Sequence, residues 1–71
     1  MAFGIPLSDK EKRYIVTFPE LSHGDVARCL NNLFKEHNNG TRRRMVVYMF
    51  RNSKNYQELL REAGGEIPQM A

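Results

Sequence analysis

The strongest constraint on the fold is a helix-forming stretch over residues 22–37 that carries its own start and stop signals. Ser22 stands three residues before Asp25, as a serine does when it caps a helix start. Asn38-Asn39-Gly40 follows, and these residue types accept the left-handed backbone that ends helices. We therefore expect a helix from Ser22 to about His37. The apolar residues at helical spacing on one face are Val26, Leu30, Leu33 and Phe34, with Ala27 at the edge.

The preceding residues predict a first helix over residues 9–18. Ser8-Asp9-Lys10-Glu11 has the form of a capping box, in which a serine hydroxyl and a glutamate carboxylate satisfy free amides at the helix start. Pro19 ends the element. The apolar face of this helix consists of Leu7, Tyr14, Ile15 and Phe18.

Three consecutive β-branched residues, Ile15-Val16-Thr17, leave a second interpretation open. Residues 13–19 could instead form the strand of a ribbon-helix-helix dimer. Arg13, Ile15 and Thr17 would then point outward, and Tyr14, Val16 and Phe18 inward. This alternative explains the β-branched run better, but the Ser8 and Ser22 caps worse.

Two more helices are predicted after Gly40. Thr41 can cap a third helix that runs through Arg51 or Asn52, and Ser53 can cap a short fourth helix over residues 55–63. The inward residues are expected to be Val46, Val47, Met49 and Phe50 in the third helix, and Tyr56, Leu59 and Leu60 in the fourth. Together these signals predict an all-α, tri-helical bundle with a short fourth C-terminal helix.

The chain has 71 residues, so we expect one domain over residues 7–63 between a flexible N-terminus, residues 1–6, and a flexible tail, residues 64–71. Its single cysteine, Cys29, has no internal disulfide partner and is expected to be a small core residue. The longest apolar run, residues 45–50, is far below the roughly 20 residues of a membrane helix. We expect no membrane association and a cytoplasmic protein, in a host cell if the chain is viral.

The charge of the chain is concentrated in residues 41–54, which hold five basic side chains and no acid, against a net charge of +3 for the whole chain. Neighbouring cations act together within a Debye length of about 8 Å and attract phosphate more strongly than scattered ones. On a helical wheel, Arg44, Tyr48 and Arg51 form an outward stripe. The pattern predicts nucleic-acid binding.

Three stretches resemble the helix-turn-helix, Myb/SANT-like small DNA-binding domains of phages and bacteria. They are LSDKEKRYI from Leu7, ELSHGDVARCLN from Glu20, and the run from Thr41-Arg42 to Val47 with Phe50 and Arg51. The likeness covers about residues 7–52. The tryptophans usual in that family are absent, and the connection over residues 34–40 is longer than a tight turn.

This resemblance implies a sequence-specific double-stranded DNA-binding protein, a transcriptional regulator whose third helix enters the major groove. Arg44, Tyr48 and Arg51 would contact base edges. Arg42, Arg43 and Lys54 would contact phosphates, which position a helix without reading sequence. Cations are disfavoured at a helix N-terminus, so an arginine triplet there calls for a reason beyond solvation.

An enzyme is not expected, because no nucleophile–base set, paired carboxylates or glycine-rich phosphate loop occurs. No cofactor or metal is expected either, since His23 and His37 lie at opposite ends of the expected second helix. A different hypothesis is a small phage-encoded effector that binds and inhibits a host protein such as a polymerase or nuclease, with Met45 and Met49 in the contact. Residues 55–71 could pack on the domain or form a homodimer.

Overall fold

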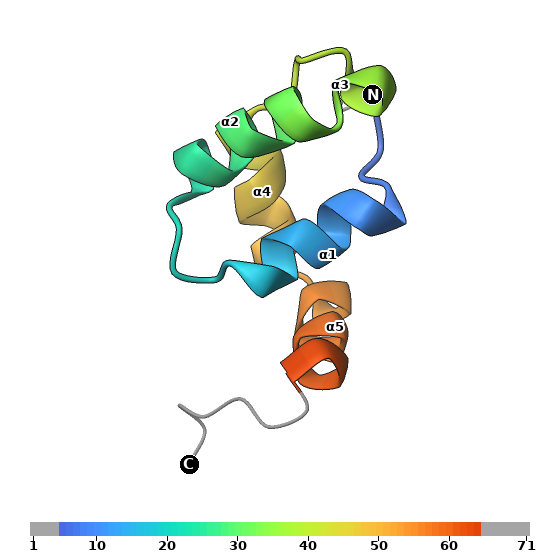
Figure 1. Ribbon diagram of the computed structural model, residues 1–71. Coiled ribbons are helices and arrows are strands. Elements are labelled where there is room, and N and C mark those ends of the chain that lie inside the picture. The colour runs from blue at the N-terminus through green and yellow to red at the C-terminus, as the bar shows by residue number, and fades with distance from the viewer. Residues whose placement is uncertain (1–4, 65–71) are drawn as a thin grey trace.

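The computed structural model describes residues 5–64, and these form five helices. In chain order they are α1 (Asp9–Thr17), α2 (His23–Leu33), α3 (Lys35–Asn38), α4 (Arg44–Arg51) and α5 (Lys54–Gly64) (Figure 1). No strand occurs in this described part of the chain, so the all-α prediction is confirmed. None of these helices is long and apolar enough to cross a membrane.

Helix α1 forms from the predicted capping box. The Glu11 amide donates to Ser8 Oγ at 3.2 Å, and the Ser8 amide donates to Glu11 Oε1 at 3.0 Å. The β-branched run lies within the helix, with Thr17 Oγ1 donating back to the Arg13 carbonyl at 2.7 Å. The ribbon-helix-helix alternative is therefore wrong, because the capping box and the burial of Ile15 outweigh the strand preference of these residues.

Helix α2 begins as predicted, with the Asp25 amide donating to Ser22 Oγ at 3.1 Å, but it ends four residues earlier than expected. The backbone leaves helical geometry at Phe34 (φ −120°, ψ 37°), and the single turn α3 follows. Asn39 and Gly40 then adopt the left-handed backbone with φ 58° and 70°, as the Asn-Asn-Gly stop signal predicts.

Helix α4 starts later than predicted, at Arg44, and Thr41 is not its cap. The Thr41 hydroxyl instead donates to the Asn38 carbonyl at 2.8 Å, which closes the turn after α3. Val47 and Phe50 face the core as expected and Val46 is half-buried. Met49 was expected inside and is 46% exposed, because Val47 and Phe50, three residues apart, take the inward face of the helix.

Helix α5 is capped by Ser53, whose Oγ accepts from the Tyr56 amide at 3.2 Å, and it begins one residue earlier than predicted. It packs against α1 and the end of α4, as expected for a segment that folds onto the domain (Figure 1). Of the expected flexible ends, residues 1–4 and 65–71 lie outside the described residues.

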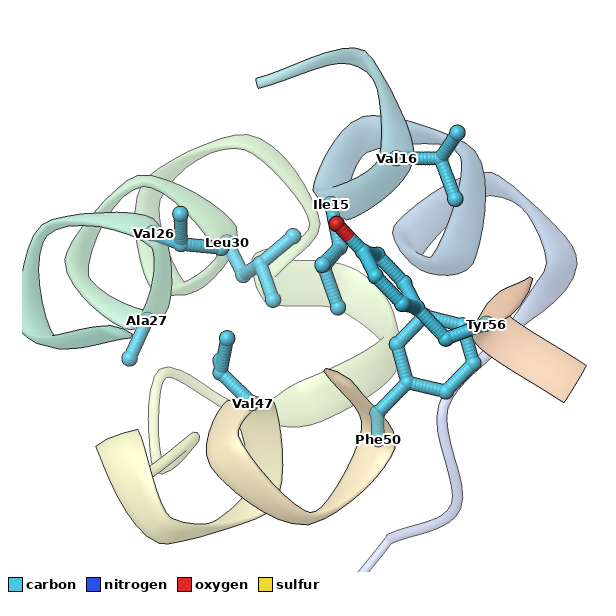
Figure 2. Close-up of a cluster of buried hydrophobic side chains, with 8 residues drawn as sticks. All are labelled: Ile15, Val16, Val26, Ala27, Leu30, Val47, Phe50 and Tyr56. Carbon is cyan, nitrogen blue, oxygen red and sulfur yellow. The ribbon is translucent and has the colours of Figure 1, made fainter. Parts of the chain in front are cut away.

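The core lies where the pair α2–α4 meets the pair α1–α5 (Figure 2). Its central side chains Ile15, Val26, Leu30 and Val47 are fully buried. Tyr56 closes one side through an edge contact with the Phe50 ring, with centroids 5.5 Å apart. Cys29, expected in the core, is half-buried at its margin. The remaining buried apolar residues are Val16 and Ala27.

Candidate nucleic-acid interface

The structure divides the six predicted DNA-contacting residues into two groups. Arg42 and Arg51 turn toward the protein and hold its elements together. Exposed on the surface are Arg43, Arg44, Tyr48 and Lys54.

Arg42 forms a buried ion pair with Glu11 and is not available to a phosphate. Its Nη2 donates to Glu11 Oε1 at 2.7 Å and its Nε donates to Oε2 at 3.1 Å. The Arg42 side chain is 2% exposed and that of Glu11 is 0%. Nη1 also donates to the Ile5 carbonyl, so the pair joins the N-terminal segment to α1 and to the start of α4. Arg42, predicted to contact a phosphate, is therefore buried and paired inside the protein.

Asparagines complete this buried network. Asn38 Nδ2 donates to Glu11 Oε2 and to the Leu30 carbonyl, both at 2.9 Å. Asn31, on α2, fixes the backbone of Arg42 by donating to its carbonyl at 2.8 Å and accepting from its amide. The loop between α3 and α4 is thus held from both α1 and α2.

The Glu11 carboxyl titrates below its ordinary pKa. Burial acts to raise this pKa, but the hydrogen bonds from the Ser8 amide, Asn38 and Arg42, together with the charge of Arg42, outweigh it. The pKa of Glu11 is therefore lowered, and the ion pair is formed at neutral pH.

Arg51 binds the turn between α1 and α2. Its Nη2 donates to the Phe18 carbonyl at 2.9 Å, and its Nη1 donates to the Leu21 carbonyl at 2.8 Å and to His23 Nδ1 at 2.9 Å. Two of these acceptors are main-chain carbonyls of the turn. A DNA base could bind Arg51 only by replacing these carbonyls as its hydrogen-bond acceptors. The predicted outward position of Arg51 is wrong, because α4 places it against the α1–α2 turn.

The start of α4 carries exposed cations. Arg43 is the N-cap residue and Arg44 the first residue of the helix, and no side chain caps this end. Within residues 5–64 neither arginine forms an ion pair with a carboxylate. Lys54, just after the end of α4, is also exposed and unpaired in the same part of the chain. Cations at a helix N-terminus oppose the helix dipole, so an anion there would be stabilised.

Apolar side chains lie beside these cations on the exposed side of α4. Met45 is 57% exposed, Tyr48 50% and Met49 46%. We call Arg44, Met45, Tyr48 and Met49 the α4 ridge. They occupy positions i, i+1, i+4 and i+5, so they form one continuous strip.

A hollow of about 510 Å³ separates the α4 ridge from the start of α2, and it brings in a cation that the sequence did not indicate. Arg28, on α2, lines the hollow together with Arg44 and Tyr48. It is exposed, and its Nη1 forms a solvent-exposed ion pair with Asp25 Oδ1 at 3.6 Å on the same helix. Only the antiparallel packing of α2 on α4 places Arg28 here, which explains why sequence periodicity missed it.

The opposite flank of α4 borders a second hollow, of about 520 Å³, with mainly apolar walls. Its lining includes Leu7, Val46, Met49 and Phe50, with Lys12 at one side. In the described part of the chain, no group of three or more metal-ligating side chains occurs.

The connection between α2 and α4 differs from the three- or four-residue turn of a helix-turn-helix motif, because it contains α3. Asn31 contacts Arg42 at one end and His23 contacts Tyr48 at the other, with ring centroids 5.4 Å apart, so α2 and α4 run side by side in opposite directions. Comparison with protein-family models, curated proteins and solved structures finds no match to this chain.

Proposed function

We propose that this protein binds double-stranded DNA through the exposed side of α4 and acts in the cytoplasm as a transcriptional regulator, not as an enzyme. The observation that carries the proposal is the pair of exposed arginines, Arg43 and Arg44, at an uncapped helix start with no carboxylate partner in residues 5–64. The first amides of a helix lack intrahelical partners, and together with two exposed cations they would favour a backbone phosphate at this end.

The roles follow from position. Arg44 and Tyr48 lie on the α4 ridge and would meet base edges, with Arg44 able to bond a guanine bidentately. Arg28 lines the hollow beside the ridge, while Arg43 and Lys54 are exposed just before and just after α4 in the chain. These three cations would contact phosphates. Arg42 and Arg51 would act only by holding α4 in place.

Fluorescence anisotropy with random duplex DNA at several salt concentrations tests the proposal. Three phosphate contacts predict a slope of log affinity against log salt of about −2.7, from about 0.9 per neutralised phosphate. Had Arg42 and Arg51 also met phosphates, the slope would lie near −4.5 on the same rule. A flat slope, or no binding at about 50 mM salt, would contradict DNA binding.

Single substitutions then separate the roles. Arg44→Ala should weaken preferred duplexes more than random ones, by about 1–3 kcal/mol of discrimination. Lys54→Ala should weaken all duplexes alike and reduce the salt slope by about one. Arg13→Ala, which removes an exposed arginine on the side of α1 that faces α5, is the matched control and should leave both unchanged.

A second candidate function is binding of a host protein, as a small phage-encoded effector that inhibits an enzyme such as a polymerase or nuclease. The exposed methionines Met45 and Met49 and the apolar hollow beside Phe50 favour it, since soft apolar surface suits protein contacts. Met49 belongs to both surfaces, so Met49→Lys should abolish inhibition of such an enzyme while it leaves nonspecific DNA affinity equal or higher. If Met49→Lys abolished both DNA binding and inhibition, the idea that the protein binds DNA and a host protein through different contacts would be contradicted.

A further inference from the structure

The α4 ridge is more apolar than a phosphate-binding surface needs to be. Of the four large hydrophobic residues exposed in the described chain, three are Met45, Tyr48 and Met49, and all three lie on this ridge. Exposed apolar side chains that gather in one place usually mark a contact surface. They stand directly beside Arg44, so a ligand of the ridge meets one guanidinium group and three apolar groups together.

We propose that the α4 ridge reads thymine, through contact of Met45, Tyr48 and Met49 with 5-methyl groups, beside a single guanine bound by Arg44. This inference rests on the proposed DNA binding. In the major groove thymine alone presents a methyl group, and the arginine–guanine pair is the commonest specific contact. Only one guanine is read by arginine, because Arg51 is held by the carbonyls of Phe18 and Leu21.

Charge favours DNA over a protein as the occupant of the ridge. The exposed cations Arg43 and Arg44 stand at the start of α4 and Lys54 just beyond its end, while the helix itself contains no acid. A helix in the major groove has a phosphate strand on each side, which matches cations at both ends of an apolar strip. A protein partner would instead need acidic residues placed opposite the cations at both ends of α4.

The length of α4 limits how many base pairs it can contact. Its eight residues extend about 12 Å at 1.5 Å per residue, and base pairs are spaced about 3.4 Å apart. Helix α4 therefore spans about three or four base pairs, and the ridge side chains contact bases within that span. One guanine and one to three thymines fill that space.

Selection from a random duplex library, followed by anisotropy titrations with deoxyuridine in place of thymidine, tests this reading. We expect enriched duplexes to place a guanine within about four base pairs of a thymine. Each methyl group removed should lower affinity about fourfold, since burial of one such group is worth roughly 0.8 kcal/mol, and the salt slope should stay the same. Enriched sequences without thymine, or equal affinity for both duplexes, would overturn the inference and leave DNA binding standing.

Variants connect the thymine preference to the ridge. Met45→Gln and Met49→Gln keep side-chain length and helix propensity but remove apolar contact, so each should reduce the preference for thymidine over deoxyuridine duplexes. In the double variant only the contribution of Tyr48 should remain. Leu33→Gln is the matched control, because Leu33 is 60% exposed on α2 and should keep the preference. A preference that is undiminished in both methionine variants and in the double variant would overturn the inference. No binding to any duplex at about 50 mM salt would reject the proposed function as well.

Discussion

Arg42 and Arg43 are neighbours in the chain and have opposite environments. The Arg42 side chain is 2% exposed and forms its ion pair inside the protein, where Glu11 is fully buried. Arg43 is exposed and has no carboxylate partner within residues 5–64. The number of basic residues in a run therefore does not give the number of cations that a ligand can contact, because some of them can form ion pairs inside the protein.

The backbone explains the difference. Arg43 has an extended conformation, with φ −108° and ψ 154°, and successive side chains of an extended segment point to opposite sides. Asn31 fixes the backbone of Arg42 against α2 and so decides which of the two points inward. The inward guanidinium then meets Glu11, whose position follows from the capping box of α1.

The largest expected effect is the loss of the buried pair. Arg42→Ala leaves the Glu11 carboxylate buried without its cation, which should lower the free energy of unfolding by about 3–5 kcal/mol. Urea denaturation followed by circular dichroism measures this change. Arg43→Ala is the matched control and should change stability by less than about 0.5 kcal/mol. Equal effects of the two substitutions would contradict the distinction between the two arginines.

The buried pair should also make stability depend on pH. The pKa of Glu11 is lowered in the folded protein, so its contribution is fully present above the unfolded value, near 4.5, and is lost as the pH falls from there through the folded pKa. Urea midpoints measured from pH 7 downward should drop steeply in that acid range. Glu11→Gln should be less stable at pH 7 and lack this part of the drop. Glu36→Gln, at an exposed position, should keep it.

Arg51 is expected to have an intermediate effect. Arg51→Ala removes the donors to the Phe18 and Leu21 carbonyls and to His23, and should cost about 1–3 kcal/mol of unfolding free energy. Lys54→Ala, which removes a nearby exposed cation, should have no measurable effect on stability. If Arg51→Ala left stability unchanged but reduced DNA affinity, the assignment of Arg51 to the α1–α2 turn would be wrong.

Local signals in the sequence predicted most of the helical framework. The caps at Ser8, Ser22 and Ser53 and the stop at Asn39-Gly40 each act through atoms only a few residues apart, so they can be read along the chain. The break at Phe34 and the late start of α4 could not be read in this way.

The candidate site was less predictable because its arrangement depends on long-range contacts. Arg42 and Glu11 are 31 residues apart, and Arg51 meets the Phe18 carbonyl over 33. Arg28 reaches the same hollow as Arg44 only when α2 has packed on α4. Helical periodicity describes one helix at a time. It therefore places Arg51 on an outward stripe, because it contains no information about the α1–α2 turn that Arg51 contacts.

The smallest expected effect has the opposite sign. Arg44 is a cation at the first position of an uncapped helix, where it opposes the helix dipole, and it has no ion-pair partner in the described residues. Arg44→Ala should therefore raise the free energy of unfolding by about 0.3–1 kcal/mol while it weakens binding to preferred DNA. Arg13→Ala, within α1, should leave stability nearly unchanged. A gain in stability together with weaker binding to preferred DNA would support the proposed contact of Arg44 with DNA. A loss of stability in Arg44→Ala would instead place Arg44 with Arg42 as a structural residue.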